Sequence, residues 1–259
     1  MHYQPRYAGD ELPSTPESLA VALADKIETL TGLFGIGQLP TGEKDPFALR
    51  RHALGILRLL IEKELPLSLD NLIAIGTEEE SVVPGVKDAT EELKQFFHDR
   101  LRVMQKDQGF TAHEVESVIG SEPAILADVP KRLKAVHDFM SLPEAESLAA
   151  ANKRIENILK KNTLPLADAV DPALLTEKEE KDLYEAIRTL EPKLEADYKA
   201  GRYEDELRSL APLKAPVDAF FDKVMVNAED EALRRNRLTL LNELHKAMNQ
   251  VAKLSCLAS

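Results

Sequence analysis

A chain of 259 residues is long enough to bury a sizeable core and to hold one large or two small domains. Its 44% hydrophobic and 30% charged residues are ordinary for a globular protein, which argues against disorder as the default state. The formal charge of −12 argues against non-specific nucleic-acid binding by bulk electrostatics, so any such role must depend on local basic patches.

The composition also limits the environment and the secondary structure. No run approaches the roughly 18 apolar residues of a membrane span, and the first residues lack the apolar core of a signal peptide, so we expect a cytoplasmic protein without a membrane partner. The absence of Trp, with 5 Tyr and 8 Phe, favours helices over strands. The single cysteine, Cys256, excludes an intrachain disulfide and a cysteine-based metal site, and we interpret it as incidental.

The first predicted helix starts near the sequence STPE at residues 14–17, which has the spacing of a capping box. Apolar residues then follow at steps of three and four, which places them on one face: Leu19, Leu23, Ile27, Leu30 and Phe34. A loop with three glycines and a proline comes next. Asp45 and Pro46 are the expected N-cap and first residue of a second helix, which closes near Glu64-Leu65-Pro66.

Basic residues accompany this second helix. Arg51 and Arg58 are two turns apart and share a stripe away from the apolar face, with Arg50 beside them and Lys44 in the preceding loop. The glycine-rich loop invites comparison with a phosphate-binding P-loop. That spacing fails, because Gly42 is followed by Glu43 and no strand precedes the loop.

Residues 64–88 are the best candidate for a domain boundary, since they read as a short helix followed by a linker rich in proline, glycine and glutamate. Helical patterns resume at about residue 88. Capping boxes are predicted at residues 111–114, 141–144 and 176–179, and three long helices make up the last third, including one through residues 207–224. We therefore predict an all-α protein, with a smaller helical piece at residues 1–80 and a helical bundle at residues 81–259.

Two basic motifs stand out from the acidic background. The first is AANKRIENIL, residues 150–159, which contains Asn152, Lys153 and Arg154. The second is ALRRNRLTLL, residues 232–241, which contains Arg234, Arg235, Asn236 and Arg237. Arg234 and Arg237 lie three residues apart and would reach successive phosphates or bases from one helical face. Spacing alone favours arginines that are solvated or paired with carboxylates, and it leaves Asn236 free to cap or bridge helices instead.

Three long segments resemble the β subunit of the bacterial heterotetrameric glycyl-tRNA synthetase, in the order found in that family. They are LADKIETLTGLFGIGQLPTGEKDPFALRRHALGILR, AANKRIENIL and FFDKVMVNAEDEALRRNRLTLLNEL, with GRYEDEL as an intervening match. The resemblance covers essentially the whole chain. Because the family's β chain is much longer, only its C-terminal portion is represented here.

The resemblance implies a fold and a function. Residues 81–259 would form a helical anticodon-binding domain similar to that of arginyl-tRNA synthetases, whose Asp/Glu-Ala-Leu-Arg signature reads Glu231-Ala232-Leu233-Arg234 here. Residues 1–80 would resemble the end of an HD-type helical domain. The chain would be the tRNA-binding part of a glycine--tRNA ligase, an enzyme subunit that is not catalytic alone. It would bind glycine tRNA, and not DNA, through residues of the three basic segments: Lys44, Arg50, Arg51, Arg58, Asn152, Lys153, Arg154, Arg234, Arg235, Asn236 and Arg237.

The same resemblance implies an α2β2 heterotetramer in which the α subunit activates glycine with ATP and Mg²⁺. No cofactor or metal would then be bound by this chain. Two other functions stay open. One is a non-catalytic helical scaffold for protein interactions. The other is an HD-type metal phosphohydrolase, for which His98-Asp99, His137-Asp138 and Asp25 supply suitable residue types in the wrong order.

Overall fold

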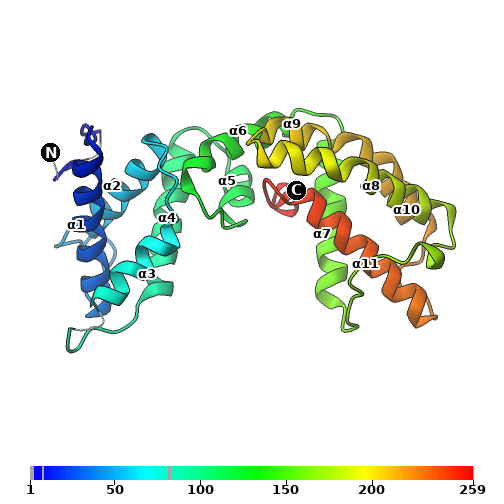
Figure 1. Ribbon diagram of the computed structural model, residues 1–259, viewed down its shortest axis with the longest axis horizontal. Helices are drawn as coiled ribbons and strands as arrows, with labels where there is room; N and C mark the ends of the chain where they lie inside the picture. Colours follow the sequence, from blue (N-terminus) through cyan, green and yellow to red (C-terminus); the bar gives the residue numbers. More distant parts are fainter. Residues whose placement is uncertain (1–2, 8, 81–82, 259) are drawn as a thin grey trace. The chain divides into compact units, whose positions relative to one another are not determined.

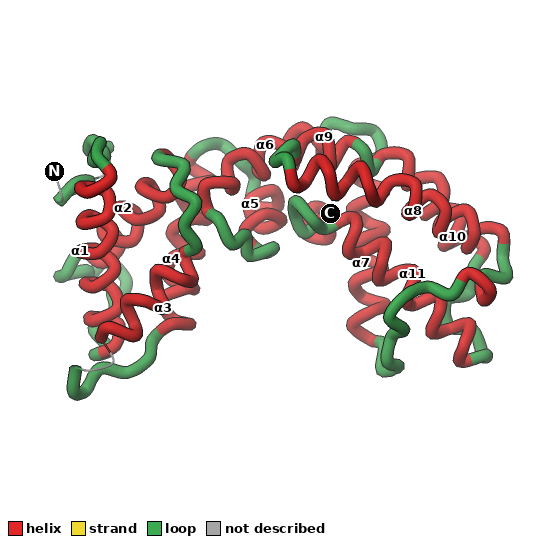
Figure 2. The backbone as a smooth tube through the Cα atoms, in the orientation of Figure 1, coloured by secondary structure: helices red, strands yellow, loops and turns green. Residues whose placement is uncertain are grey.

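The computed structural model describes residues 3–7, 9–80 and 83–258, and within these residues it contains helices and no β-strand. The chain divides into two compact units. The first comprises residues 1–110 and 122–130, and the second comprises residues 111–121 and 131–259. The all-α fold class predicted from the sequence is confirmed (Figures 1 and 2).

The described residues of the first unit form four α-helices and a short 3₁₀-helix: α1 (Pro16–Gly35), α2 (Leu49–Glu62), α3 (Leu69–Glu80), α4 (Thr90–Asp107) and η1 (Leu126–Asp128). Helix α1 packs against α2 and α3, and α4 packs against α2 and α3. The apolar stripe predicted for the first helix forms part of this core, since Leu23, Ile27, Leu30 and Phe34 are all buried. The amphipathic period therefore identified the inward face of α1 correctly.

The loop between α1 and α2 differs in detail from the prediction. Helix α2 begins at Leu49, with Ala48 as its N-cap in a left-handed conformation, so Asp45 is not the N-cap residue. Asp45 still caps the helix from a distance, because its carboxylate accepts hydrogen bonds from the backbone N–H groups of Leu49 (2.8 Å) and Arg50 (3.0 Å). Gly35 is required for a close approach, since a Cβ there would overlap Val86.

The second unit contains the remaining elements, and Figure 1 labels its α-helices. Its α-helices are α5 (Ala112–Ile119), α6 (Val129–Met140, in this unit from residue 131), α7 (Ala145–Lys161), α8 (Lys178–Lys199), α9 (Tyr203–Arg208), α10 (Lys214–Lys223) and α11 (Glu231–Met248). Its 3₁₀-helices are η2 (Pro172–Leu174), η3 (Ala211–Leu213) and η4 (Leu254–Leu257). Helix α11 packs against α7 and α8, α8 packs against α10, and η4 packs against α5 and α7.

Two sequence-based expectations about these elements are wrong. Residues 207–224 do not form one helix, because the chain breaks between α9 and α10 at the segment that contains Pro212. Proline lacks an N–H to continue the helical ladder, and its ring clashes with the preceding turn. The predicted cap at residues 141–144 is also absent, since α7 begins after Glu144 without a side-chain cap.

In the second unit the other two predicted capping boxes are present, one of them shifted, and the box predicted at residues 14–17 in the first unit forms one residue later, between Thr15 and Ser18. Thr111 and Glu114 form the reciprocal box at the start of α5 as expected. At α8 the box is formed by Glu177 and Glu180, one residue beyond the predicted position. The amphipathic segments that they open are both helical.

The division into units also differs from the predicted boundary after residue 80. Helix α4 packs against α2 and α3, which places it in the first unit, and the division falls after Phe110. Of the predicted linker, residues 83–89 are described without a helix, whereas residues 81–82 lie outside the described residues.

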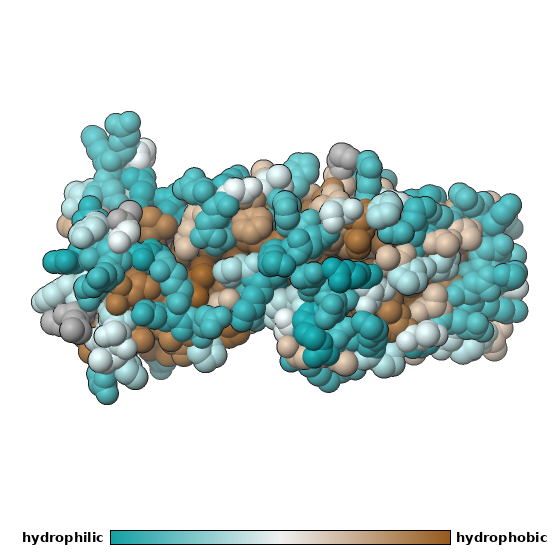
Figure 3. Space-filling view, turned by 90° about the horizontal axis from the view of Figure 1, so that it is seen from above, coloured by the Kyte–Doolittle hydropathy of each residue, from teal (hydrophilic) through white to brown (hydrophobic). Residues whose placement is uncertain are grey.

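Hydrophilic side chains cover most of the face seen in Figure 3. Among the described residues, no helix is long and apolar enough to cross a membrane.

Candidate nucleic-acid interface

The basic residues singled out in the sequence fall into two groups. One group lies on α7 and α11 in the second unit, and the other lies around the start of α2 in the first unit. What a basic side chain can bind depends on whether its donors are already engaged.

Helix α11 carries the RRNR sequence in its first two turns. Its N-cap is Asp230, whose carboxylate accepts hydrogen bonds from the backbone N–H groups of Ala232 (2.8 Å) and Leu233 (3.0 Å). The cap determines where the helix starts. It therefore also determines the direction around the helix in which the side chain of Arg234 and those after it project.

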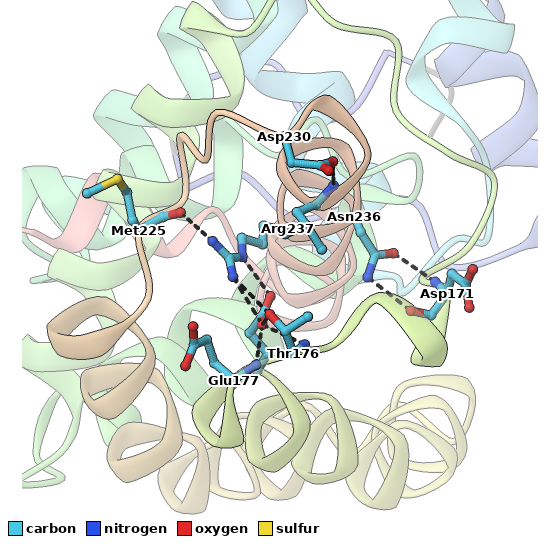
Figure 4. Close-up of polar contacts among 9 residues, drawn as sticks. Asp171, Thr176, Glu177, Met225, Asp230, Asn236 and Arg237 are labelled. Atoms are coloured by element: carbon cyan, nitrogen blue, oxygen red, sulfur yellow. Dashed lines mark hydrogen bonds and ion pairs between the residues drawn. The ribbon is translucent and has the colours of Figure 1, made fainter.

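Arg237 points into the protein. Its Nε donates to Oε1 of Glu180 at 2.8 Å, and its other nitrogens donate to the carbonyl of Met225 and the hydroxyl of Thr176 (Figure 4). Arg237 is 5% exposed and Glu180 is fully buried. Arg237 therefore joins α11 to the start of α8, and its placement corrects the interpretation that Arg234 and Arg237 present one basic face outward.

The charge state of Glu180 agrees with this pairing. Burial by itself would raise the pKa of Glu180, but hydrogen bonds from Arg237, from the backbone N–H of Glu177 and from Thr176 hold that pKa below its ordinary value. The carboxylate is thus charged and compensated inside the unit. A buried ion pair of this kind depends on both partners.

Asn236 is also an internal contact. Its Oδ1 accepts a hydrogen bond from the backbone N–H of Asp171 at 2.8 Å, and its Nδ2 donates to the carbonyl of the same residue at 3.0 Å (Figure 4). The side chain is 3% exposed. Asn236 therefore bridges α11 to the segment at η2, which is the alternative that the sequence left open, and it is closed to a ligand.

Arg234 and Arg235 reach the surface. Arg235 donates to the carboxylate of Glu231 one turn earlier at 2.9 Å, in a solvent-exposed pair. Arg234 makes no side-chain hydrogen bond or ion pair within the described part of the chain, and its Nε is buried without a partner. It lines a cavity of about 440 Å³ together with residues from α7, α11 and two loops: Ile158, Lys161, Asn162, Thr163, Leu164, Asn227 and Leu238.

The basic motif on α7 also contains both buried and exposed residues. Asn152 is fully buried, and neither of its side-chain polar atoms has a hydrogen-bond partner within the described residues. Lys153 and Arg154 are exposed. Lys153 donates to the carbonyl of Ala258 at 3.3 Å, and the guanidinium of Arg154 stacks over the ring of Phe221 at 4.1 Å. Asn152 is therefore removed from any exposed patch.

The cavity beside Arg234 includes donors that the sequence motifs did not mark as a site. Lys161 comes from the end of α7, Thr163 follows it, and Asn227 belongs to the loop before α11. Lys161 had a visible signal, because it ends the run of basic residues that continues AANKRIENIL. Asn227 had none, since the loop meets α7 only through the tertiary fold.

In the first unit, Arg50, Arg51 and Arg58 line one cavity of about 590 Å³, on an apolar floor that includes Leu54 and Met104. Arg50 and Arg58 are partly engaged. Arg50 donates to the carbonyl of Gly42 at 2.6 Å. Arg58 pairs with Glu62 at 2.6 Å and donates to the carbonyl of Asp10 at 2.9 Å.

Arg51 and Lys44 are the exposed basic residues of this segment, and no side-chain hydrogen bond or ion pair engages either of them within the described chain. Arg51 also faces a smaller cavity of about 220 Å³ beside Lys26 and His52. Spacing alone thus placed Arg50, Arg51 and Arg58 together correctly. It did not show which of these arginines has hydrogen-bond donors that are not already engaged.

Neither His98 nor His137 is among the lining residues of these cavities. His98, on α4, lines a separate cavity with Asp70 and Glu122, and its pKa is lowered mainly by burial. His137, on α6, contacts the carboxylate of Glu114 at 2.8 Å. No group of three or more His, Cys, Asp and Glu within the described residues is placed to hold a metal ion.

Two family models match the chain, one over each part. The model described as the glycyl-tRNA synthetase beta subunit matches residues 1–120, and the model described as the DALR anticodon binding domain matches residues 148–255. The second match contains Arg234, Lys161 and the α7 motif. It ends within η4.

Comparison over the whole chain finds similarity to proteins with the same name as the first family model. The chain is 55% identical to the glycine--tRNA ligase beta subunit of Delftia acidovorans over all of its length, 55% identical to that of Polaromonas naphthalenivorans and 51% identical to that of Nitrosomonas europaea. It spans about a third of these relatives, between 36% and 38% of their length. From end to end, the chain is therefore similar to the C-terminal part of glycine--tRNA ligase beta subunits, as its sequence motifs predicted.

Proposed function

We propose that this chain is the tRNA-binding part of a glycine--tRNA ligase β subunit, and that it holds the anticodon arm of glycine tRNA at the cavity beside Arg234. The observation that carries the proposal is the state of Arg234. It is the arginine of the RRNR sequence that lines a cavity and has no hydrogen bond or ion pair to another described residue. It belongs to the segment that matches the DALR anticodon binding domain.

The chemistry of the cavity suits unpaired RNA bases. Single-stranded loops expose base edges and faces, which proteins read with hydrogen bonds and with stacking on guanidinium planes. Arg234 supplies a planar guanidinium, Asn227 an amide with donors and an acceptor, and Lys161 a cation for a nearby phosphate. The apolar wall made by Ile158, Leu164 and Leu238 would cover a base once it is unstacked.

Local charge can outweigh the net charge of −12. Arg234 and Lys161 line the cavity, and none of its described lining residues carries a carboxylate. Exposed Lys153 and Arg154 follow one another on the same α7 helix. A phosphate backbone would therefore meet positive potential here, although the net charge of the chain is negative.

The proposal includes partners outside this chain. In the assembled enzyme, an α subunit would activate glycine with ATP and Mg²⁺, and the chain described here would contribute tRNA recognition and no catalytic group. We also place the protein in the cytoplasm, where aminoacyl-tRNA is used. These statements rest on the similarity to the glycine--tRNA ligase beta subunits.

The test is a fluorescence titration with glycine tRNA and with a tRNA that carries another anticodon, using the wild type and the Arg234→Ala variant. We expect the wild type to prefer glycine tRNA, and the variant to lose about 1–3 kcal/mol of that binding, together with most of the preference. Arg208→Ala is the matched control, because Arg208 is an exposed arginine on α9 that pairs with Glu204. Equal binding of both tRNAs by the wild type would refute anticodon recognition and favour a protein-interaction scaffold.

A further inference from the structure

A mostly buried lysine of the first unit has no hydrogen bond or ion pair with another described residue. Lys26 lies in the middle of α1 and is 3% exposed, and its ammonium group has no hydrogen bond or ion pair within the described residues. The ammonium nitrogen is not fully buried, and an ammonium group that has lost part of its hydration gains from an acceptor brought by a ligand. Burial lowers the pKa of Lys26, and neighbouring Asp25 opposes that effect.

Helix α2 is shaped to admit this side chain. A Cβ at Gly55 would lie 2.9 Å from Cε of Lys26 and 3.2 Å from its Cδ, so any larger residue would displace the lysine. Glycine inside a helix reduces helix stability relative to alanine. The absence of a side chain at Gly55 thus opens the path along which the stem of Lys26 crosses α2.

The side chain leads to a cavity. Lys26 lines a space of about 220 Å³ with Arg51 and His52 from α2, Asp25 from α1 and Arg6 from the chain before α1. Nδ1 of His52 is buried there without a hydrogen-bond partner. The pKa of His52 is lowered by burial and by the charge of Lys26, which favours the neutral imidazole, and the neutral ring has one N–H to donate.

The charges around the cavity favour an anion. Arg6 is already paired with Asp10 at 3.1 Å, whereas Lys26 and Arg51 have no carboxylate partner within 4.0 Å among the described residues. Asp25 offsets one of these two positive charges, and a net positive charge remains. Ammonium, guanidinium and imidazole N–H donors at one cavity match a group with several acceptor oxygens.

We propose that Lys26, Arg51 and His52 form a binding site for a single phosphate group in the first unit. This site is separate from the Arg234 cavity, which belongs to the other unit. Free phosphate and an RNA phosphodiester offer the same chemistry to these three side chains. Binding of an RNA phosphodiester rests on the proposed function, whereas binding of free phosphate does not.

The experiment uses the 259-residue chain with isotope-labelled histidine and titrates inorganic phosphate at constant pH and ionic strength. We expect a saturable shift of the His52 ring resonances. Lys26→Met should weaken phosphate binding by about tenfold or more, since it removes a charge-assisted hydrogen bond. Lys63→Met is the matched control, because Lys63 is exposed at the end of α2, and it should bind phosphate like the wild type.

Stability separates a binding role from a structural one. If Lys26 is kept for a ligand, Lys26→Met should unfold at the same temperature as the phosphate-free wild type or higher, because it replaces a partly desolvated charge that has no partner by an apolar side chain. Arg51→Gln provides a second variant at an exposed position that does not depend on the core. An absent or non-saturable His52 shift, or unchanged phosphate affinity in both variants, would overturn the proposal.

The source of the phosphate is read from a parallel titration with glycine tRNA. A shift of the His52 resonances that disappears in Lys26→Met assigns the site to an RNA phosphodiester, whereas a response to inorganic phosphate alone assigns it to the free anion. The Arg234→Ala variant keeps the two proposals distinct, since it should lose anticodon-arm binding and retain the response to inorganic phosphate.

Discussion

Nε of Arg237 lies 2.8 Å from Oε1 of Glu180, and both side chains are buried where α11 meets the start of α8. The two residues are 57 positions apart in the sequence. A residue that belongs to the most basic segment of the chain therefore serves the interior of the unit. Any loss of tRNA binding on its removal would follow from loss of the fold.

Arg237→Ala should destabilise the chain by about 3–5 kcal/mol, because it leaves the carboxylate of Glu180 buried and uncompensated. Urea denaturation at pH 7 measures the change. Arg235→Ala is the control, since Arg235 pairs with Glu231 in solvent and its removal should change the free energy of unfolding by only about 0.2–1 kcal/mol. Similar effects of the two substitutions would contradict the internal role of Arg237.

Glu206 should make the stability of the protein depend on pH. Burial, opposed by nearby Arg132, raises its pKa from the ordinary value of 4.5 to about 8, and neither carboxylate oxygen has a hydrogen-bond partner within the described residues. Between these two pKa values the folded state holds a proton that the unfolded chain has released. The stability contribution is therefore present below pH 4.5 and is lost as the pH rises through about 8.

The Glu206→Gln substitution isolates this contribution. Unfolding free energies of the wild type and the variant, measured from pH 5 to pH 9, should diverge as the pH rises, with the variant favoured. The difference should grow by at most about 1.4 kcal/mol per pH unit. A difference that stays constant over this range would show that Glu206 titrates normally in the folded protein.

Gly35→Ala should destabilise the first unit. A Cβ at this position would overlap Cγ1 of Val86 and lie 3.0 Å from the carbonyl oxygen of Lys87, whose N–H also donates to the carbonyl of Gly35. Backbone cannot move away cheaply, so we expect a loss of about 1–3 kcal/mol in urea denaturation. At Gly55 the opposing atoms belong to the flexible end of Lys26, and Gly55→Ala should be nearly neutral or stabilising. An equal loss at both positions would rule out this distinction.

Arg234→Ala should change the salt dependence of tRNA binding if the guanidinium also neutralises a phosphate. In a plot of log affinity against log salt, one such contact on single-stranded RNA contributes about −0.7 to the slope. The variant should therefore show a slope that is shallower by about this amount. Arg208→Ala should keep the wild-type slope. An unchanged slope in Arg234→Ala, with weaker binding, would assign Arg234 to a base and not to the backbone.

Local patterns predicted most of the helices, because helix formation depends on interactions within a few residues along the chain. The period of Leu23, Ile27 and Leu30 identified the buried face of α1, and Thr111 with Glu114 identified the start of α5. The patterns failed where the chain must turn. Pro212 breaks what the apolar period alone would continue as one helix.

By itself, the sequence determined the all-helical class, the inward faces of individual helices and the similarity to the C-terminal part of glycine--tRNA ligase beta subunits. It placed Arg234 and Arg237 on the same helix and gave no reason to prefer one of them as a ligand-binding residue. Only the tertiary structure separated them, by bringing Glu180 against Arg237 and a cavity against Arg234. The reason is physical: side-chain availability depends on which distant carboxylates and carbonyls pack nearby, and no local period encodes that.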